Sequence, residues 1–242
     1  MNLDGVAAGG LRSRISDVQS RIAASCTSAG RSPDSVCLVA VTKMVTADMV
    51  RTVMSAGLEV FAENRTHEAD AKIAKVGGGT WHLIGHLQRN KARIAAQRFA
   101  CIQSVDSPRL ARRLEAVREQ RKLDVLVQVN IMGARQQDGV APPELAALCN
   151  VIDRETSLTL RGLMTIGPSR ATATALRECF STLHEMRNSL RSQVPNQPLD
   201  QLSMGMTDDF ELAIAEGSTL VRVGRAIFGE RPPAVTNIPA PD

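Results

Sequence analysis

The stretch Val36-Cys37-Leu38-Val39-Ala40-Val41-Thr42 is short, apolar and rich in β-branched residues, which is typical of a buried strand in a parallel sheet. It follows the break Gly30-Arg31-Ser32-Pro33-Asp34. After Lys43, an amphipathic segment covers residues 47–56. A buried strand followed directly by an amphipathic helix is one βα unit, so this stretch predicts the first unit of an α/β fold.

The same alternation continues along the chain. Eight strands are predicted, at Val36–Thr42, Leu58–Ala62, Trp81–Gly85, Cys101–Val105, Val125–Ile131, Leu160–Ile166, Leu202–Met204 and Leu220–Ile227. Helices are predicted between them at Ala47–Ala56, Thr66–Lys75, Arg89–Gln97, Pro108–Arg121, Pro142–Arg154, Ala173–Leu190 and Asp208–Glu216, with an extra N-terminal helix at Leu11–Ala29. This order favours a single closed (β/α)8 TIM barrel, although an open doubly wound sheet gives a similar pattern in any half of the chain.

Length and composition agree with one barrel. With 242 residues, of which 43% are apolar, the chain is expected to form a single domain over 1–242 with a Pro-rich tail at 230–242. It has no apolar run of about eighteen residues and no secretory leader at its start, so we expect a cytoplasmic protein that does not contact membranes. The five cysteines are scattered, which argues against disulfides and a zinc ribbon.

The charge of the chain bears on its partners. A net charge of +4 could suggest nucleic acid, but the basic residues are spread among acidic ones and aromatic residues make up only 2%. A phosphorylated small molecule suits this modest excess of positive charge better than nucleic acid does. A nucleic-acid-binding protein remains an alternative for which the sequence offers no specific motif.

Lysine is scarce, and tyrosine is absent. The lysines are Lys43, Lys72, Lys75, Lys91 and Lys122. Arginine cannot form an imine, so Schiff-base chemistry is restricted to these five. Lys43 is the first candidate, because it follows a strand directly and the carboxyl ends of barrel strands form the functional face. Position alone favours an ordinary exposed lysine at a strand end.

Two segments near the end of the chain are candidates for holding a phosphate. Residues 202–209 pass from strand to helix, where Ser203 and backbone N–H groups at a helix start suit an anion. Residues 221–229 contain Gly224, which permits close approach of the main chain, and Arg225. In barrels, phosphate sites commonly use the loops after the last two strands, although the same residues could form an ordinary capped turn.

Other polar residues follow predicted strands. Arg222 could donate a hydrogen bond to a ligand ring nitrogen, or it could pair with Glu63. Asn64 could bind a phenolic oxygen, and His86 could donate a proton or only line the mouth. His82 and His86 are four residues apart, but they lie on a predicted strand with no carboxylate motif, so no metal site is expected.

Several motifs resemble one family, the pyridoxal phosphate homeostasis proteins, and together they cover nearly the whole chain. They are residues 40–43 (AVTK), 61–64 (FAEN), 81–91 (WHLIGHLQRNK), 104–107 (SVDS), 127–131 (VQVNI), 162–166 (GLMTI), 202–214 (LSMGMTDDFELAI) and 221–229 (VRVGRAIFG). The resemblance implies the barrel of the alanine racemase N-terminal domain.

The resemblance also implies roles for residues. It implies that Lys43 carries pyridoxal 5'-phosphate (PLP), that Ser203, Gly224 and Arg225 hold its phosphate, that Arg222 faces the pyridine nitrogen and that Asn64 lies near the ring. The chain departs from the family in three places. It has Arg65 where Tyr is frequent, Ala62 where Gly is common, and Gln137 where a second lysine often stands, which puts a second cofactor-holding role of that loop in doubt.

Two functions follow from this resemblance. The first is a PLP carrier in vitamin B6 homeostasis, a monomer that delivers the cofactor to apo forms of PLP-dependent enzymes without efficient catalysis. The alternative is a PLP-dependent amino-acid racemase of low activity. Two-base racemisation needs a second acid/base opposite the lysine, and in related racemases a tyrosine fills this role, whereas this chain contains none.

Overall fold

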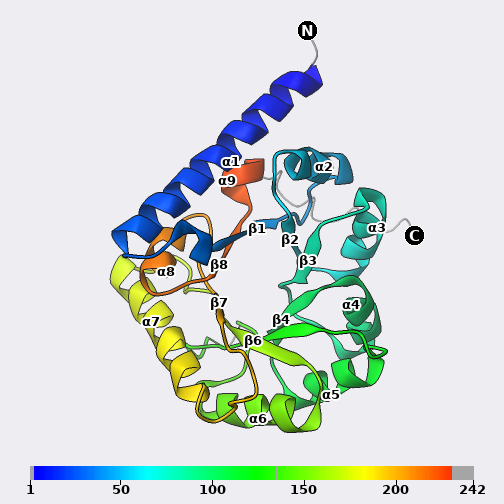
Figure 1. The fold of residues 1–242 in the computed structure, drawn as a ribbon, viewed down its shortest axis with the longest axis vertical. Helices are drawn as coiled ribbons and strands as arrows, with labels where there is room; N and C mark the ends of the chain where they lie inside the picture. Colours follow the sequence, from blue (N-terminus) through cyan, green and yellow to red (C-terminus); the bar gives the residue numbers. More distant parts are fainter. Residues whose placement is uncertain (1–2, 135, 231–242) are drawn as a thin grey trace, which may run out of the picture.

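The fold is a closed barrel of eight parallel strands, seen end-on in the computed structural model, which describes residues 3–134 and 136–230 (Figure 1). The strands run in sequence order around the ring: β1 (Cys37–Val41), β2 (Val60–Glu63), β3 (Thr80–Leu83), β4 (Cys101–Val105), β5 (Asp124–Gln128), β6 (Thr159–Met164), β7 (Gln201–Ser203) and β8 (Leu220–Val223). Pairing of Cys37 with Leu220 and of Ala40 with Val223 closes the ring between β1 and β8. The predicted TIM barrel is confirmed, and the open sheet is excluded.

The α-helices surround this ring (Figure 1). They are α1 (Leu3–Ser28), α2 (Ala47–Ser55), α3 (Thr66–Val76), α4 (Ala92–Arg98), α5 (Pro108–Val117), α6 (Leu145–Glu155), α7 (Ala173–Leu190), α8 (Phe210–Ala215) and α9 (Arg225–Phe228). Three short 3-10 turns, η1 (Pro33–Ser35), η2 (Arg89–Lys91) and η3 (Pro142–Glu144), complete the set. None of the helices in the described part of the chain is both long and apolar enough to span a membrane.

Side-chain caps set the starts of several of these helices. Thr46, Ser107 and Thr172 each precede a helix and accept a hydrogen bond from a backbone N–H of its first turn. Pro108 occupies the first turn of α5, where its missing N–H costs nothing. These caps end the loops that follow β1, β4 and β6, and so they fix the length of the loops at the functional face.

The N-terminal helix α1 lies along α8 and α9 (Figure 1). Arg14 Nε donates to the carbonyl of Ile227 at 2.6 Å, which ties α1 to α9. Arg31, just after α1, donates to the carbonyls of Ile214 and Ser218 at 2.7 and 2.8 Å. The extra helix therefore braces the last two βα units.

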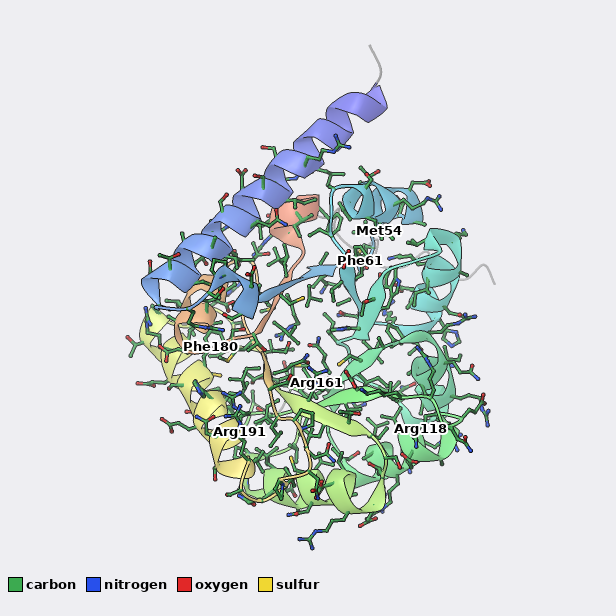
Figure 2. The ribbon with its side chains drawn as sticks, viewed as in Figure 1. Met54, Phe61, Arg118, Arg161, Phe180 and Arg191 are labelled. Carbon is green, nitrogen blue, oxygen red and sulfur yellow. The ribbon has the colours of Figure 1, made fainter. Side chains whose placement is uncertain are left out.

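Two apolar layers form the core. The outer layer lies between the strands and the helices and includes Phe61 and Phe180, both fully buried (Figure 2). The inner layer fills the barrel and includes Val39, Leu126 and Met164. Polar side chains are also buried: His82, Gln103, Ser203 and Arg222, from β3, β4, β7 and β8.

The last strand is shorter than predicted. It ends at Val223, and Arg225–Phe228 forms helix α9, so the predicted strand Leu220–Ile227 was wrong in its second half. A short apolar run does not by itself distinguish strand from helix, and Gly224 marks the change. Arg225 therefore lies at the start of helix α9, beside the opening at the carboxyl ends of the strands. Of the predicted tail at 230–242, all but Glu230 lies outside the described residues.

Gly162 allows a close approach of two strands, and its replacement tests the barrel packing. An added Cβ would lie 1.8 Å from the carbonyl oxygen of Gln201, at a backbone φ of 157°. We expect Gly162→Ala to lower the free energy of unfolding by about 3 kcal/mol or more, measured by denaturant unfolding. As a control, Gly10→Ala in α1, whose nearest atom would be at 3.9 Å, should be neutral or slightly stabilising. Equal effects of the two substitutions would contradict this account.

Candidate functional site

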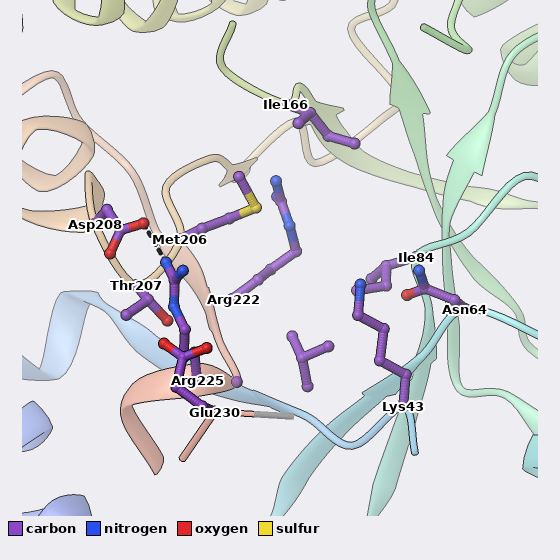
Figure 3. A pocket seen from close by; sticks show the side chains of 12 residues that line it. Lys43, Asn64, Ile84, Ile166, Met206, Thr207, Asp208, Arg222, Arg225 and Glu230 are labelled. Carbon is purple, nitrogen blue, oxygen red and sulfur yellow. Dashed lines mark hydrogen bonds and ion pairs between the residues drawn. The ribbon is translucent and has the colours of Figure 1, made fainter. Parts of the chain in front are cut away.

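A cavity of about 360 Å³ opens at the carboxyl ends of the strands. Its polar or flexible lining residues are Lys43, Asn64, Met206, Thr207, Asp208, Arg222, Gly224, Arg225 and Glu230, and its apolar ones are Val41, Ile84 and Ile166. Lys43, just after β1, and Arg222, on the neighbouring strand β8, both extend into it (Figure 3). Five of the predicted site residues therefore meet here: Lys43, Asn64, Arg222, Gly224 and Arg225.

Lys43 sits in a tight turn at the end of β1. The backbone N–H of Val45 donates to the carbonyl of Thr42 at 2.9 Å, which closes the turn. Met44 has a φ of 62°, a left-handed conformation that costs a residue with a side chain roughly 1 kcal/mol. The turn directs Lys43 toward the cavity and leaves Met44 59% exposed.

A buried ion pair supports this turn from behind. Lys72 Nζ lies 2.6 Å from Glu63 Oε1 and donates to the carbonyl of Thr42 at 2.7 Å. The Thr42 hydroxyl donates to the same Glu63 oxygen at 2.6 Å. Glu63 is fully buried, and its second carboxylate oxygen has no hydrogen-bond partner among the described residues. The pair thus fixes the residue that immediately precedes Lys43.

Arg222 is buried, with 4% of its surface exposed. Its guanidinium donates to Ser203 Oγ at 2.6 Å and to the carbonyl of Thr165 at 2.8 Å. The alternative pairing with Glu63 does not occur, because Glu63 pairs with Lys72. Burial lowers the pKa of Arg222 to about 10, and the nearby Asp209 carboxylate partly opposes this shift.

The loop after β7 forms the wall beside Arg222. Gly205 has a φ of 92°, and an added Cβ would lie 2.9 Å from Phe210 Cα, so the tight turn requires glycine. The N–H of Met206 donates to Asp209 Oδ1 at 2.5 Å. Burial raises the pKa of Asp209, while this N–H and Arg222 oppose the shift. Arg225 forms an ion pair with Asp208 at the edge of the cavity (Figure 3).

Two predicted site residues lie outside the lining. Ser203 is fully buried, and its hydroxyl accepts from Arg222 and donates to Gln103 Oε1 at 2.6 Å. His86 lies on the rim, with its Nδ1 3.2 Å from Asp106 and 3.5 Å from Asp138, and it lines neighbouring grooves.

Sequence reasoning missed Thr207, Met206 and Asp208 as lining residues, and also the apolar pair Ile84 and Ile166. Thr207 had a usable signal, since it is a hydroxyl residue just after the Gly205 turn and just before a helix. The two isoleucines had none, because an apolar residue at a strand end reads as core.

The residues fit a phosphorylated aromatic aldehyde. Lys43, Arg222 and Arg225 bring three cationic groups to the cavity, and Asn64 Oδ1 is buried without a hydrogen-bond partner among the described residues. Such an orphaned atom and a buried guanidinium both call for polar groups of a ligand. In the described part of the chain, no cluster of three metal-binding side chains occurs.

Comparisons with known proteins define the class. Residues 20–232 match the family model of the alanine racemase N-terminal domain. The pyridoxal phosphate homeostasis protein of Pseudomonas aeruginosa is 42% identical over 224 residues, covering 90% of this chain and 94% of that protein. The protein of the same name from Escherichia coli K12 is 37% identical, with 90% and 95% covered.

A solved structure agrees. PipY from Synechococcus elongatus, determined with PLP bound, superposes with a TM-score of 0.81 at 36% identity, covering 90% of this chain and all of that one. The chain therefore belongs to the pyridoxal phosphate homeostasis protein family, within the class of alanine racemase N-terminal domain barrels.

The ion pair behind Lys43 is open to test. Among the described residues, removal of Lys72 leaves the buried Glu63 carboxylate with the Thr42 hydroxyl as its one hydrogen-bond partner. We expect Lys72→Met to lower the free energy of unfolding by about 3–5 kcal/mol, because an unpaired buried charge remains. Lys75→Met, in the last turn of the same helix, is the control and should change it by less than about 0.5 kcal/mol. A loss below 1 kcal/mol for Lys72→Met would show that the pair is dispensable.

His82 predicts a pH dependence. Burial lowers its pKa from 6.5 to about 4, so the unfolded chain binds this proton more readily than the folded one. The corresponding stability is complete above pH 6.5 and is lost as the pH falls toward 4, by roughly 3 kcal/mol. In His82→Gln this part of the acid destabilisation should disappear, as measured by denaturant unfolding across the pH range. An unchanged slope would assign the acid sensitivity to other groups.

Proposed function

We propose that this protein binds PLP covalently, as a Schiff base on Lys43, and serves in intracellular vitamin B6 homeostasis. The observation that carries the proposal is the convergence of Lys43, Arg222, Arg225 and the orphaned Asn64 oxygen on one cavity. The family membership and the PLP-bound relative support it. When bound, the cofactor supplies an aldehyde that an amine can capture and a ring that can accept electrons.

The chain's own residues have distinct tasks in this proposal. Gly224 and Arg225, at the start of α9, and Thr207 with its neighbouring main chain, hold the phosphate. Asn64 binds the phenolic oxygen. Gly85, which follows β3, has no side chain and so lies close to the Asn64 backbone: a Cβ added at Gly85 would lie 2.2 Å from the carbonyl oxygen of Asn64. This close approach keeps the Asn64 amide near the position that binding requires. The Ser203 hydroxyl donates to Gln103, so we assign Ser203 to holding Arg222 and not to donating a proton to the phosphate. His86 lies on the rim of the cavity.

Arg222 decides what the bound cofactor can do. An arginine remains protonated and can only donate hydrogen bonds, so it favours an unprotonated pyridine nitrogen. An unprotonated ring withdraws electrons weakly. We therefore propose storage and delivery of the cofactor, with no efficient catalysis, as the role of this site.

We also propose where the protein works, in which oligomeric state, and which molecules receive the cofactor. The protein works in the cytoplasm as a monomer, with the whole chain forming one cofactor-binding unit, and apo forms of PLP-dependent enzymes receive the cofactor. At the loop where relatives often carry a second lysine, Gln137 Nε2 donates to the carbonyl of Ile166 at 2.8 Å. That contact supports a structural task for this loop, without a second cofactor-holding lysine.

A racemase of low activity is the second candidate, because the barrel is shared with alanine racemase. Racemisation through two bases requires an acid/base group on the cofactor face opposite Lys43. The chain has no tyrosine, and in the described part the titratable side chains that line the cavity besides Lys43 are Asp208, Arg222, Arg225 and Glu230. Asp208 is paired with Arg225 at the edge of the cavity, and neither arginine transfers a proton readily near neutral pH.

The lysine assignment has a direct test. PLP-loaded protein should show the yellow absorption of a Schiff base, and borohydride reduction should add the cofactor mass to the peptide that contains Lys43. In Lys43→Ala both the absorption and the adduct should be lost. Lys91→Ala is the control, since Lys91 lies on the rim next to His67, 2.6 Å from it, and outside the cavity.

Two results would overturn the proposal. A Schiff-base band that survives in Lys43→Ala would move the attachment to another lysine. Rapid, saturable formation of D-alanine from L-alanine by the wild-type protein, abolished in Lys43→Ala, would favour the racemase.

A further inference from the structure

A chain of hydrogen bonds crosses the inside of the barrel beneath the cavity. We propose that Gln103 and His82, which do not line the cavity, are positioning residues that orient Arg222 toward the ring of the bound cofactor. This inference rests on the proposed function for its ligand, but the hydrogen-bond chain itself is a property of the protein alone.

The four side chains come from four strands. Arg222 on β8 donates to Ser203 Oγ on β7 at 2.6 Å, Ser203 donates to Gln103 Oε1 on β4 at 2.6 Å, and Gln103 Nε2 lies 2.8 Å from His82 Nδ1 on β3. Gln103 and Ser203 are fully buried, and His82 is 8% exposed. The chain therefore spans the barrel interior from β8 to β3.

The chemistry of these groups gives the chain one direction. A guanidinium has no acceptor, so Ser203 Oγ must accept from Arg222. The single hydroxyl proton of Ser203 then goes to Gln103 Oε1, which turns the amide N–H toward His82. His82 Nδ1 must accept this bond, so the ring carries its proton on Nε2 and is neutral. Reversal at any one link would place two donors or two acceptors face to face.

Burial makes this order matter. The walls around the chain are apolar, with Val39, Leu126 and Met164 in the same inner layer, so a broken link leaves a buried polar group without a partner. Asp209 is the carboxylate whose charge acts on Arg222, but no carboxylate among the described residues is hydrogen-bonded to the guanidinium. Neutral hydrogen bonds to Ser203 and Thr165, and not an ion pair, thus set its orientation.

The consequence concerns the ligand. Ser203 and Thr165 each take one N–H of Arg222, and because the guanidinium also lines the cavity, its remaining donors are left for a ligand. A ring nitrogen of the ligand that faces this guanidinium must accept a hydrogen bond from it. If the hydrogen bond to Gln103 is lost, the Ser203 hydroxyl can rotate. The guanidinium of Arg222 then no longer has a fixed acceptor, and its orientation toward the ligand is lost.

Two substitutions of Gln103 test the inference. Gln103→Met keeps the length of the side chain and removes both polar atoms, whereas Gln103→Glu keeps the acceptor for Ser203 and replaces the donor to His82 by an acceptor. Gln128→Met is the matched control, because Gln128 is also a buried strand glutamine, 3% exposed, whose amide donates to the carbonyl of Asp138, away from this chain.

The first readout needs no cofactor. In ¹⁵N NMR spectra of the wild-type protein, His82 should be neutral with its proton on Nε2. In Gln103→Glu the facing carboxylate oxygen can only accept, so Nδ1 should carry a proton, which moves the ring out of its wild-type tautomer. A wild-type ring protonated on Nδ1, or an unprotonated Nδ1 in Gln103→Glu, would overturn the proposed direction.

The second readout uses the PLP-loaded protein. Gln103→Met should shift the absorption maximum of the cofactor and raise its dissociation constant roughly tenfold, as expected for one lost buried hydrogen bond, whereas Gln128→Met should do neither. An unchanged spectrum and affinity in Gln103→Met would show that Gln103 has only a structural role. If Gln103→Met does not fold, the same comparison is made with Gln103→Glu.

The two proposals fail in different ways. A wild-type protein that binds no PLP would refute the proposed function, while the tautomer of His82 would still decide the direction of the chain. Cofactor binding on Lys43 that does not respond to Gln103 would refute the positioning role and leave the proposed function intact.

Discussion

The guanidinium of Arg222 is the constraint on which this site depends. A permanent charge inside a barrel is costly, and here the described structure compensates it with neutral acceptors and with one carboxylate, Asp209, that acts at a distance. Those acceptors lie just after β6 and on β7, so the strands must keep their register to hold the charge. The polar interior, the Gly205 turn and the wall of the cavity all follow from accommodating this one group.

The position of Lys43 is set by the main chain around it. Met44 adopts a left-handed conformation in the turn, and the buried Glu63–Lys72 pair hydrogen-bonds to Thr42. The base of the lysine is thus rigid. The cavity therefore receives a guanidinium held by side-chain and carbonyl acceptors and an amine whose backbone is fixed by a tight turn.

Much of the fold could be predicted from the sequence, because buried parallel strands appear as short apolar runs and helices as amphipathic segments of different period. Lys43 could be placed at the mouth by the same logic, since it ends the first such run. The end of β8 could not, because Val-Arg-Val-Gly-Arg-Ala-Ile has an apolar content that fits strand and helix alike. Gln103 was also hidden: one polar residue inside an apolar run gives no sign of which partners across the barrel will meet it.

Closure of the ring between β1 and β8 brings the amine, just after β1, beside the guanidinium on β8, about 180 residues further along the polypeptide, with Val39 paired with Arg222. During synthesis the amine emerges early, but its counterpart leaves the ribosome almost last. A nascent chain therefore exposes Lys43 long before the binding cavity exists. Under the proposed function, tight binding of the cofactor requires the final strand to dock, so a protein that carries it has completed its fold.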